Sequence, residues 1–218
     1  MAEDLLADSE FFAEVDPELR LHLASLGRRR RLVRGDVLFA EGDEPQELFV
    51  VIDGRIAIAN RSPDGRESVV ALMEAGDLFG EMAMLDGQPR SAEARALEPS
   101  IVLAIPYAPV QAMFEENPSL LWGVVRMLSR RLRTTDEALA DSVFLDVTGR
   151  TAKRLLELAA GSDEFQLPVT QEELAGMVGA SRERVNKAIA SFIRLGWLAQ
   201  HDRRYKILQR DRLELRAR

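Results

Sequence analysis

Short apolar runs dominate the first half of the chain, and glycines interrupt them at near-regular intervals. The runs are VLFA, LFVVI, RIAIAN, SVVALM and SIVLAIP, and the glycines around them are Gly35, Gly42, Gly54, Gly65, Gly76 and Gly80. Such runs predict β-strands, and glycine beside Asp or Glu is typical of the tight turns between strands. Alternation over residues 55–60 predicts a strand with one apolar face. We therefore expect a short helical lead over residues 10–27 and then a small antiparallel barrel or sandwich.

A long helix should follow the strands, with Asn117 as its N-cap and Pro118 at its first position. Its residues repeat at alternating spacings of four and three: Leu121, Val125, Leu128, Leu132, Thr135, Leu139 and Ser142. Two such residues per heptad are typical of a seam between paired helices. We predict that this helix pairs with a second copy of the chain; the alternative is a helix that lies on its own domain.

The chain after the long helix carries a helix-turn-helix pattern. Asp146 is the expected N-cap of a new helix, which places a hinge just before it. Thr170 and Glu173 have the spacing of a capping box at the start of a further helix. That helix should end at Gly179, and Ser181 should cap the next one after a short turn.

The two faces of this last helix differ in character. Val185, Ala188, Ile189 and Phe192 share an inward face, and Arg182, Glu183, Asn186 and Lys187 share the other. A charged face of this kind can simply be solvated. These side chains, however, cluster at the N-terminal end, where a recognition helix meets base edges, and Arg, Lys and Glu are suited to guanine and cytosine. Ser181 and Thr170 stand at helix N-termini that can meet phosphates.

Two short strands should form a wing around residues 201–204, with Arg203 and Arg204 at its tip. These arginines either contact DNA phosphates or solvate a turn. Charge separates this region from the rest of the chain: 14 basic and 10 acidic residues lie from Asp146 onward, and 15 basic and 26 acidic residues precede it. Only the C-terminal third is electropositive, which indicates that the acidic and the basic parts of the chain have different tasks.

The absence of cysteine excludes disulfides, thiolate metal sites, iron–sulfur clusters and a cysteine nucleophile, and it fits a reducing cytosol. The opening MAEDLLADSE is acidic where an export signal would be basic. The longest uncharged stretch, residues 99–114, is broken by prolines and too short to span a bilayer. We expect a soluble, cytoplasmic protein with no membrane partner.

One loop, GDLFGEMAMLDGQPRSAEARA, holds Glu81 and Arg90 among small residues. By themselves these two side chains are typical of an ordinary loop salt bridge. Three blocks of sequence, however, resemble the cyclic-AMP receptor/FNR family of bacterial transcription regulators, in the family's order and across essentially the whole chain. They are FGE…PRSA at Phe79 to Ala92, FLDVTGR at Phe144 to Arg150 and QEELAGMVGASRERVNK at Gln171 to Lys187.

The resemblance implies an α+β fold with three parts. Residues 1–117 would form a cyclic-nucleotide-binding antiparallel β-roll, residues 118–144 a dimerisation helix, and residues 145–218 a winged helix-turn-helix. The implied DNA-binding residues are Thr170, Gln171, Ser181, Arg182, Glu183, Asn186, Lys187, Arg203 and Arg204.

The resemblance also makes the loop a phosphate-binding cassette formed by Phe79, Gly80, Glu81, Met82, Arg90, Ser91 and Ala92. Arg90 would pair with the cyclic phosphate and Glu81 would accept from the ribose 2′-hydroxyl, while Gly80 lets the backbone approach the sugar. Thr135 and Asp136 align with the family's base-contacting pair. Asp136 replaces the usual serine or asparagine; a carboxylate accepts from the adenine amino group and is repelled by guanine O6, but burying it beside an anion is costly.

We therefore expect a homodimeric, sequence-specific regulator that binds a double-stranded DNA operator, with cyclic AMP as an allosteric ligand and no metal. RNA polymerase is a further expected partner, although the loop over residues 159–168 is shorter than the polymerase-contacting loop of the best-known members. The alternative is a regulator of the same fold that binds DNA without cyclic AMP or responds to cyclic GMP or cyclic di-GMP. A metal or redox sensor is disfavoured by the lack of cysteine, and a phosphodiesterase by the presence of only His22 and His201, so no enzymatic activity is expected.

Overall fold

The computed structural model of the chain describes residues 4–62, 67–202 and 204–218. The chain divides into two compact units within the long helix α4 (Leu121–Phe144), between Leu132 and Arg133. The domain boundaries expected at residues 117 and 144 remain a prediction. No helix of the described residues is long and apolar enough to cross a membrane.

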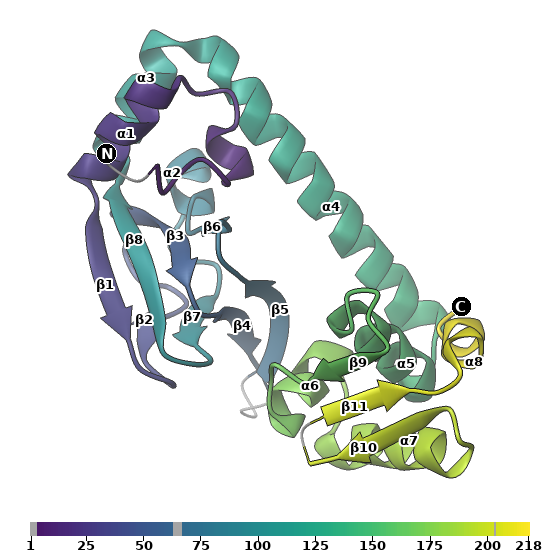
Figure 1. The fold of residues 1–218 in the computed structure, drawn as a ribbon. Coiled ribbons are helices and arrows are strands. Elements are labelled where there is room, and N and C mark those ends of the chain that lie inside the picture. The colour runs from purple at the N-terminus through teal and green to yellow at the C-terminus, as the bar shows by residue number, and fades with distance from the viewer. Residues whose placement is uncertain (1–3, 63–66, 203) are drawn as a thin grey trace. The chain divides into compact units, whose positions relative to one another are not determined.

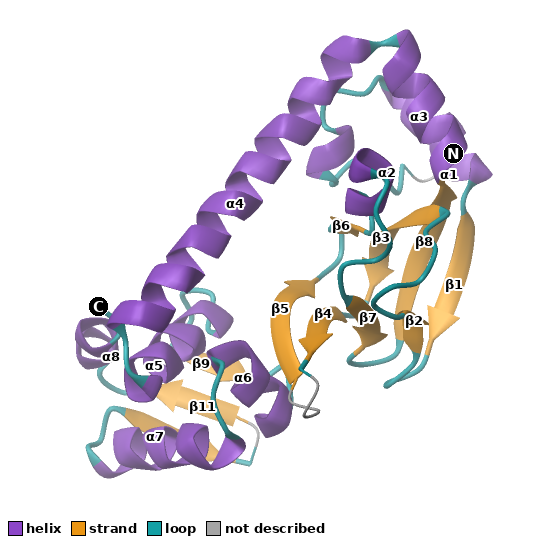
Figure 2. Cartoon of the chain, turned by 180° about the vertical axis from the view of Figure 1, so that it is seen from behind, coloured by secondary structure: helices purple, strands orange, loops and turns teal. Residues whose placement is uncertain are grey.

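Two antiparallel sheets form the framework of the first unit (Figures 1 and 2). In the described residues their strand orders are β1-β8-β3-β6 and β2-β7-β4-β5. The strands are β1 (Arg28–Leu32), β2 (Val37–Phe39), β3 (Glu47–Asp53), β4 (Ile56–Arg61), β5 (Glu67–Met73), β6 (Leu78–Phe79), β7 (Glu93–Ala96) and β8 (Ser100–Pro106). The five predicted strands are confirmed as β2, β3, β4, β5 and β8. Strand β1 was missed because four consecutive exposed arginines give it no alternating apolar pattern.

Strand β3 is buried on both faces and so connects two hydrophobic clusters. Phe49 and Val51 pack between the two sheets. Leu48 and Val50 pack in a second cluster, together with side chains from the helical segments. In β4 the expectation of a single apolar face is wrong, because the alanines of that strand are buried as completely as Ile56. Alanine is small and apolar, so its burial carries no desolvation penalty.

The helical segments of this unit are η1 (Glu10–Phe12), α1 (Pro17–Leu26), α2 (Met82–Asp86), α3 (Tyr107–Glu116) and η2 (Pro118–Leu120). The predicted helical lead is divided, because Asp16 accepts a hydrogen bond from the Glu18 N–H at 2.9 Å and starts α1 anew. Asn117 and Pro118 are the N-cap and the first residue, as predicted, but of a 3₁₀ turn, η2, that precedes α4. The Asn117 side chain makes no capping hydrogen bond, and the Leu120 N–H bonds to the Asn117 carbonyl at 3.0 Å.

Helix α4 has a buried side and an exposed apolar stripe. Its first turns pack on the first unit through Gly123, Val124 and Met127. Leu132 and Leu139, from the predicted seam, remain 62% and 64% exposed in the single chain. The interpretation of α4 as a helix that covers its seam with its own domain is therefore wrong for these two positions.

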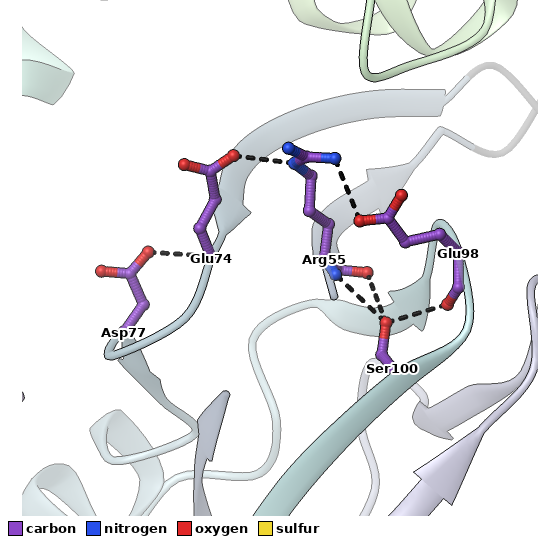
Figure 3. Close-up of polar contacts among 5 residues, drawn as sticks. All are labelled: Arg55, Glu74, Asp77, Glu98 and Ser100. Carbon is purple, nitrogen blue, oxygen red and sulfur yellow. Dashed lines mark hydrogen bonds and ion pairs between the residues drawn. The ribbon is translucent and has the colours of Figure 1, made fainter. Parts of the chain in front are cut away.

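An ion-pair network surrounds the turn between β3 and β4 (Figure 3). Arg55 Nε donates to Glu74 at 2.8 Å and Nη1 donates to Glu98 at 3.0 Å. The Ser100 hydroxyl accepts from the Arg55 N–H at 3.1 Å and donates to the Glu98 carbonyl at 2.8 Å. Gly54 has a φ of 82°, and a Cβ there would lie 2.3 Å from the Ser100 oxygen, so this turn requires glycine.

The second unit contains helices packed with a three-stranded antiparallel sheet of order β10-β11-β9. Its elements are α5 (Val147–Leu158), β9 (Glu164–Gln166), α6 (Gln171–Val178), α7 (Arg182–Arg194), β10 (Leu198–His201), β11 (Arg204–Ile207) and α8 (Arg210–Arg216). The predicted helix-turn-helix and two-stranded wing are confirmed as α6, α7, β10 and β11. Strand β9 and helix α8 were not predicted.

Local capping decides where these helices begin and end. Asp146 caps α5 by accepting from the Gly149 N–H at 2.8 Å, and the capping box of Thr170 and Glu173 is present, as predicted. Gly179 ends α6 in the left-handed conformation with a φ of 68°. Ser181 is the N-cap of α7, as predicted, but its hydroxyl makes no capping hydrogen bond.

Candidate functional site

The cassette loop folds back so that Arg90, near its end, contacts Gly80, near its start. It leaves β6, passes Gly80 and the short helix α2, and brings Arg90 back so that Nη1 donates to the Gly80 carbonyl at 2.7 Å. Gly80 has a φ of 80°, and a Cβ there would lie 2.7 Å from the same Arg90 nitrogen. Glycine is therefore required for the backbone conformation and for the close approach of the guanidinium.

Arg90 is a buried cation whose direct partners are neutral. Its side chain belongs to a residue only 6% exposed, Nη2 donates to the Glu47 carbonyl at 2.6 Å, and Nη1 also donates to the Tyr107 hydroxyl at 2.9 Å. The guanidinium lies 4.2 Å from the centre of the Phe39 ring. Among the residues that the structure describes, none places a carboxylate within ion-pair distance of it. Burial lowers the pKa of Arg90, so its charge is held at a cost that an anion would offset.

Glu81 is also buried, at 1% exposure, and its carboxylate accepts from Arg131 Nη1 of α4. Arg131 Nη2 donates to the Leu78 carbonyl at the end of β6. Burial raises the pKa of Glu81, while the charge and hydrogen bond of Arg131 act in the opposite direction. The interpretation of Glu81 and Arg90 as an ordinary salt bridge is wrong, because each side chain binds other groups.

The remaining predicted ligand residues have different environments. Phe79 stacks on Phe49 with 5.4 Å between ring centres and belongs to the core between the sheets. Ala92 is buried, whereas Met82 and Ser91 are exposed. Thr135 and Asp136 are exposed on the part of α4 that belongs to the second unit. The structure therefore brings together the two ends of the cassette, residues 79–82 and 90–92.

Sequence reasoning missed Arg131, which binds Glu81, and Tyr107, which binds Arg90. Arg131 lies one helical turn before Thr135, and that spacing was its only signal in the sequence. Tyr107 begins α3, and its hydroxyl donates to the Gly80 carbonyl. Burial raises the pKa of Tyr107, while the neighbouring Arg90 acts to lower it.

The predicted DNA-binding side chains of α7 are all exposed: Arg182, Glu183, Asn186 and Lys187. Glu183 and Lys187 form an ion pair of 2.6 Å across one helical turn, and the hydrogen bond from Lys187 lowers the pKa of Glu183. The inward face of Val185, Ala188, Ile189 and Phe192 is buried, as predicted. Arg204 is exposed on β11, and the prediction for Arg203 lies outside the described residues.

A cavity of about 480 Å³ joins the starts of α6 and α7 to the wing, and Thr170, Gln171, Arg182 and Tyr205 are among its lining residues. Gln171 Nε2 donates to the Tyr205 hydroxyl at 2.8 Å, while its buried Oε1 has no hydrogen-bond partner among the described residues. In the described part of the chain, no group of three or more His, Asp or Glu side chains could hold a metal ion.

Two family models match the chain. Residues 29–117 match the cyclic nucleotide-binding domain and residues 149–216 match the Crp-like helix-turn-helix domain. A CRP-like cAMP-activated global transcriptional regulator of Mycobacterium tuberculosis is 36% identical over 99% of this chain and 100% of that protein.

Solved structures agree with these matches. The catabolite activator protein of Thermus thermophilus has a TM-score of 0.55 and 30% identity, with 96% of this chain and 98% of that chain covered. The c-di-GMP-responsive global regulator CLP of Xanthomonas campestris has a TM-score of 0.78 and 26% identity, with coverages of 88% and 99%. The chain therefore belongs to the CRP/FNR family of cyclic nucleotide-responsive, DNA-binding transcription regulators.

Proposed function

We propose that this protein is a homodimeric, sequence-specific transcription regulator whose DNA binding is controlled allosterically by cyclic AMP. The observation that carries the ligand proposal is the buried guanidinium of Arg90, whose direct partners are neutral carbonyl, hydroxyl and aromatic groups. A buried cation of this kind favours a bound anion. The name of the M. tuberculosis relative, a cAMP-activated regulator, supports cyclic AMP as that anion.

In this proposal Arg90 pairs with the cyclic phosphate, and Ser91 adds a hydrogen-bond donor. Glu81 accepts from the ribose 2′-hydroxyl, and Arg131 fixes the orientation of its carboxylate. Phe79, Gly80, Met82 and Ala92 shape the rest of the cassette. Thr135 and Asp136 would contact the base, where a carboxylate favours the amino group of adenine over O6 of guanine.

The exposed stripe of α4 supports a homodimer. Burying Leu132 and Leu139 in a seam would contribute about 1.5–3 kcal/mol for each side chain before entropic costs. Glutamate at both positions should therefore yield a monomer in sedimentation velocity, whereas Glu137→Lys, on the face opposite the stripe, should remain a dimer. A wild-type protein that sediments as a monomer with and without cyclic AMP would contradict the proposal.

For DNA, we propose that Arg182, Glu183, Asn186 and Lys187 of α7 read base edges in the major groove. The DNA backbone beside these bases would be contacted by Thr170, Gln171, Ser181, Arg203 and Arg204. A two-fold dimer would then bind two half-sites about one helical turn apart. RNA polymerase is a proposed further partner. No catalytic activity is proposed, and formation of AMP from cyclic AMP would contradict this.

The decisive experiment has two steps. Calorimetric titrations with cyclic AMP, cyclic GMP and cyclic di-GMP should give saturable heat with cyclic AMP, and flat heats with all three would refute the ligand site. DNA affinity, measured by fluorescence anisotropy, should then change as cyclic AMP is added; an affinity that is equal at every concentration would refute allosteric control.

A second candidate is a regulator that responds to cyclic di-GMP. One observation favours it: the structurally similar Xanthomonas regulator is described as c-di-GMP responsive. Saturable heat with cyclic di-GMP alone would establish this candidate in place of the first.

A further inference from the structure

Helix α8, at the end of the chain, packs against α5, the helix that follows the long helix α4 (Figures 1 and 2). Leu213 of α8 is completely buried. The two backbones approach closely at Gly149, where a Cβ would lie 3.0 Å from the Arg216 carbonyl oxygen and 3.0 Å from Arg216 Nη1. The last turn of α8 is therefore fitted to the first turn of α5.

Arg216 binds the residue that joins α4 to α5. Its Nη2 donates to both carboxylate oxygens of Asp146, and Asp146 Oδ1 also accepts from the Gly149 N–H at 2.8 Å. The Gly149 hydrogen bond and the Arg216 guanidinium both lower the pKa of Asp146. One carboxylate thus caps α5 and anchors α8.

The linker between α4 and α5 consists of residues 145–146 only. Its other tethers come from α5: Arg150 Nη1 donates to the Leu145 carbonyl at 2.7 Å, and Lys153 pairs with Asp141 of α4 at 2.5 Å. Arg150 Nε also donates to the Val178 carbonyl at the end of α6, at 2.9 Å. A rotation of α5 relative to α4 must change the dihedral angles of this linker, and α6 would follow α5 because Arg150 joins them.

We infer that α8 is a clamp on this hinge and that Arg216 is a positioning residue for the ligand response. This inference rests on the proposed control of DNA binding by a cyclic nucleotide. By holding Asp146 in its capping position, Arg216 limits the arrangements that the hinge can adopt. Without the Arg216 side chain the hinge adopts more arrangements. A ligand that prefers one of them then changes the DNA affinity less.

The test compares Arg216→Ala with Arg210→Ala in the full-length protein. Arg210 lies on the same helix and forms an ion pair of 2.9 Å with Asp163, so the control removes a similar interaction away from the hinge. The measured quantity is the ratio of DNA affinities with and without saturating cyclic AMP. Arg216→Ala should lower this ratio about fivefold, as expected for a partly exposed ion pair, whereas Arg210→Ala should leave it unchanged. Arg216→Lys should retain part of the wild-type ratio.

Amide hydrogen exchange supplies a readout that does not depend on the ligand. Exchange of a peptide spanning residues 142–151 should become faster in Arg216→Ala and not in Arg210→Ala, while the amides of α5 beyond the hinge stay protected. Equal hinge exchange in the two variants would overturn the clamp, and so would equal affinity ratios if cyclic AMP changes the DNA affinity of the wild type. If cyclic AMP leaves wild-type DNA affinity unchanged but hinge exchange still responds to Arg216→Ala, the proposed function fails and the clamp stands.

Discussion

Replacing Arg90 by methionine should separate ligand binding from folding. Methionine retains an unbranched apolar stem and removes the guanidinium, with its charge, its hydrogen-bond donors and its contact with the Phe39 ring. The guanidinium is almost completely buried among neutral groups, and burial lowers its pKa, so the fold bears a cost for keeping it charged. A ligand phosphate would gain from that same charge. The substitution should therefore affect binding far more than stability.

The expected magnitudes follow from these contacts. A guanidinium and a phosphate about 4 Å apart attract each other by about 4 kcal/mol at an effective dielectric constant of about 20. With desolvation subtracted, a loss of about 2–3 kcal/mol remains, which raises the Kd about 30- to 150-fold. For folding, the carbonyls of Gly80 and Glu47 each lose a donor, at about 1 kcal/mol apiece, and removal of the buried charge offsets part of this loss.

Calorimetric titration with cyclic AMP and urea denaturation of the same preparations measure the two effects. Arg55→Met is the matched control, because Arg55 is an arginine of the same unit whose partners Glu74 and Glu98 lie outside the cassette (Figure 3). The control should keep the wild-type Kd within about twofold, a few tenths of a kcal/mol. An Arg90→Met protein that binds cyclic AMP as tightly as the wild type would refute the phosphate role.

Three further predictions concern other parts of the chain. Burial raises the pKa of Glu81 above 4.5, so the folded chain binds this proton more tightly than the unfolded chain does. Relative to Glu81→Gln, the wild type should therefore lose unfolding free energy as the pH rises from 4.5 through the raised pKa. Urea denaturation over this pH range tests the prediction, and parallel profiles for the two proteins would contradict it. Thr170→Ala should lower the free energy of unfolding by about 1 kcal/mol because it removes a capping box, whereas Ser181→Ala should lower it by only about a few tenths of a kcal/mol. Equal melting temperatures for the two variants would argue against this difference. Arg182→Ala should relax base preference, while Arg204→Ala should weaken binding to all DNA sequences about equally and reduce its salt dependence, which anisotropy titrations over a salt series would test.

Features set by neighbours along the chain were predicted correctly. The capping box at Thr170 and the cap at Asp146 depend on residues three positions away, and the buried face of α7 depends on helical periodicity. Strands with apolar side chains were predicted because their apolar runs are also local features of the sequence. Strand β1 was missed because its pairing with β8 lies in the backbone and leaves no mark on a run of arginines.

Within the candidate site, the sequence identified the cassette and the two charged residues, but not what each of them contacts. The partner of Glu81 is Arg131, 50 positions away, and one acceptor for Arg90 is the Glu47 carbonyl, 43 positions away. Contacts across such separations depend on how strands and helices pack, and local residue patterns do not specify that packing. The sequence alone therefore determined most of the helices and strands and located the residues that we propose to meet a ligand. Only the tertiary structure decided that Arg90 would be buried among neutral groups and that α8 would be bound to the hinge.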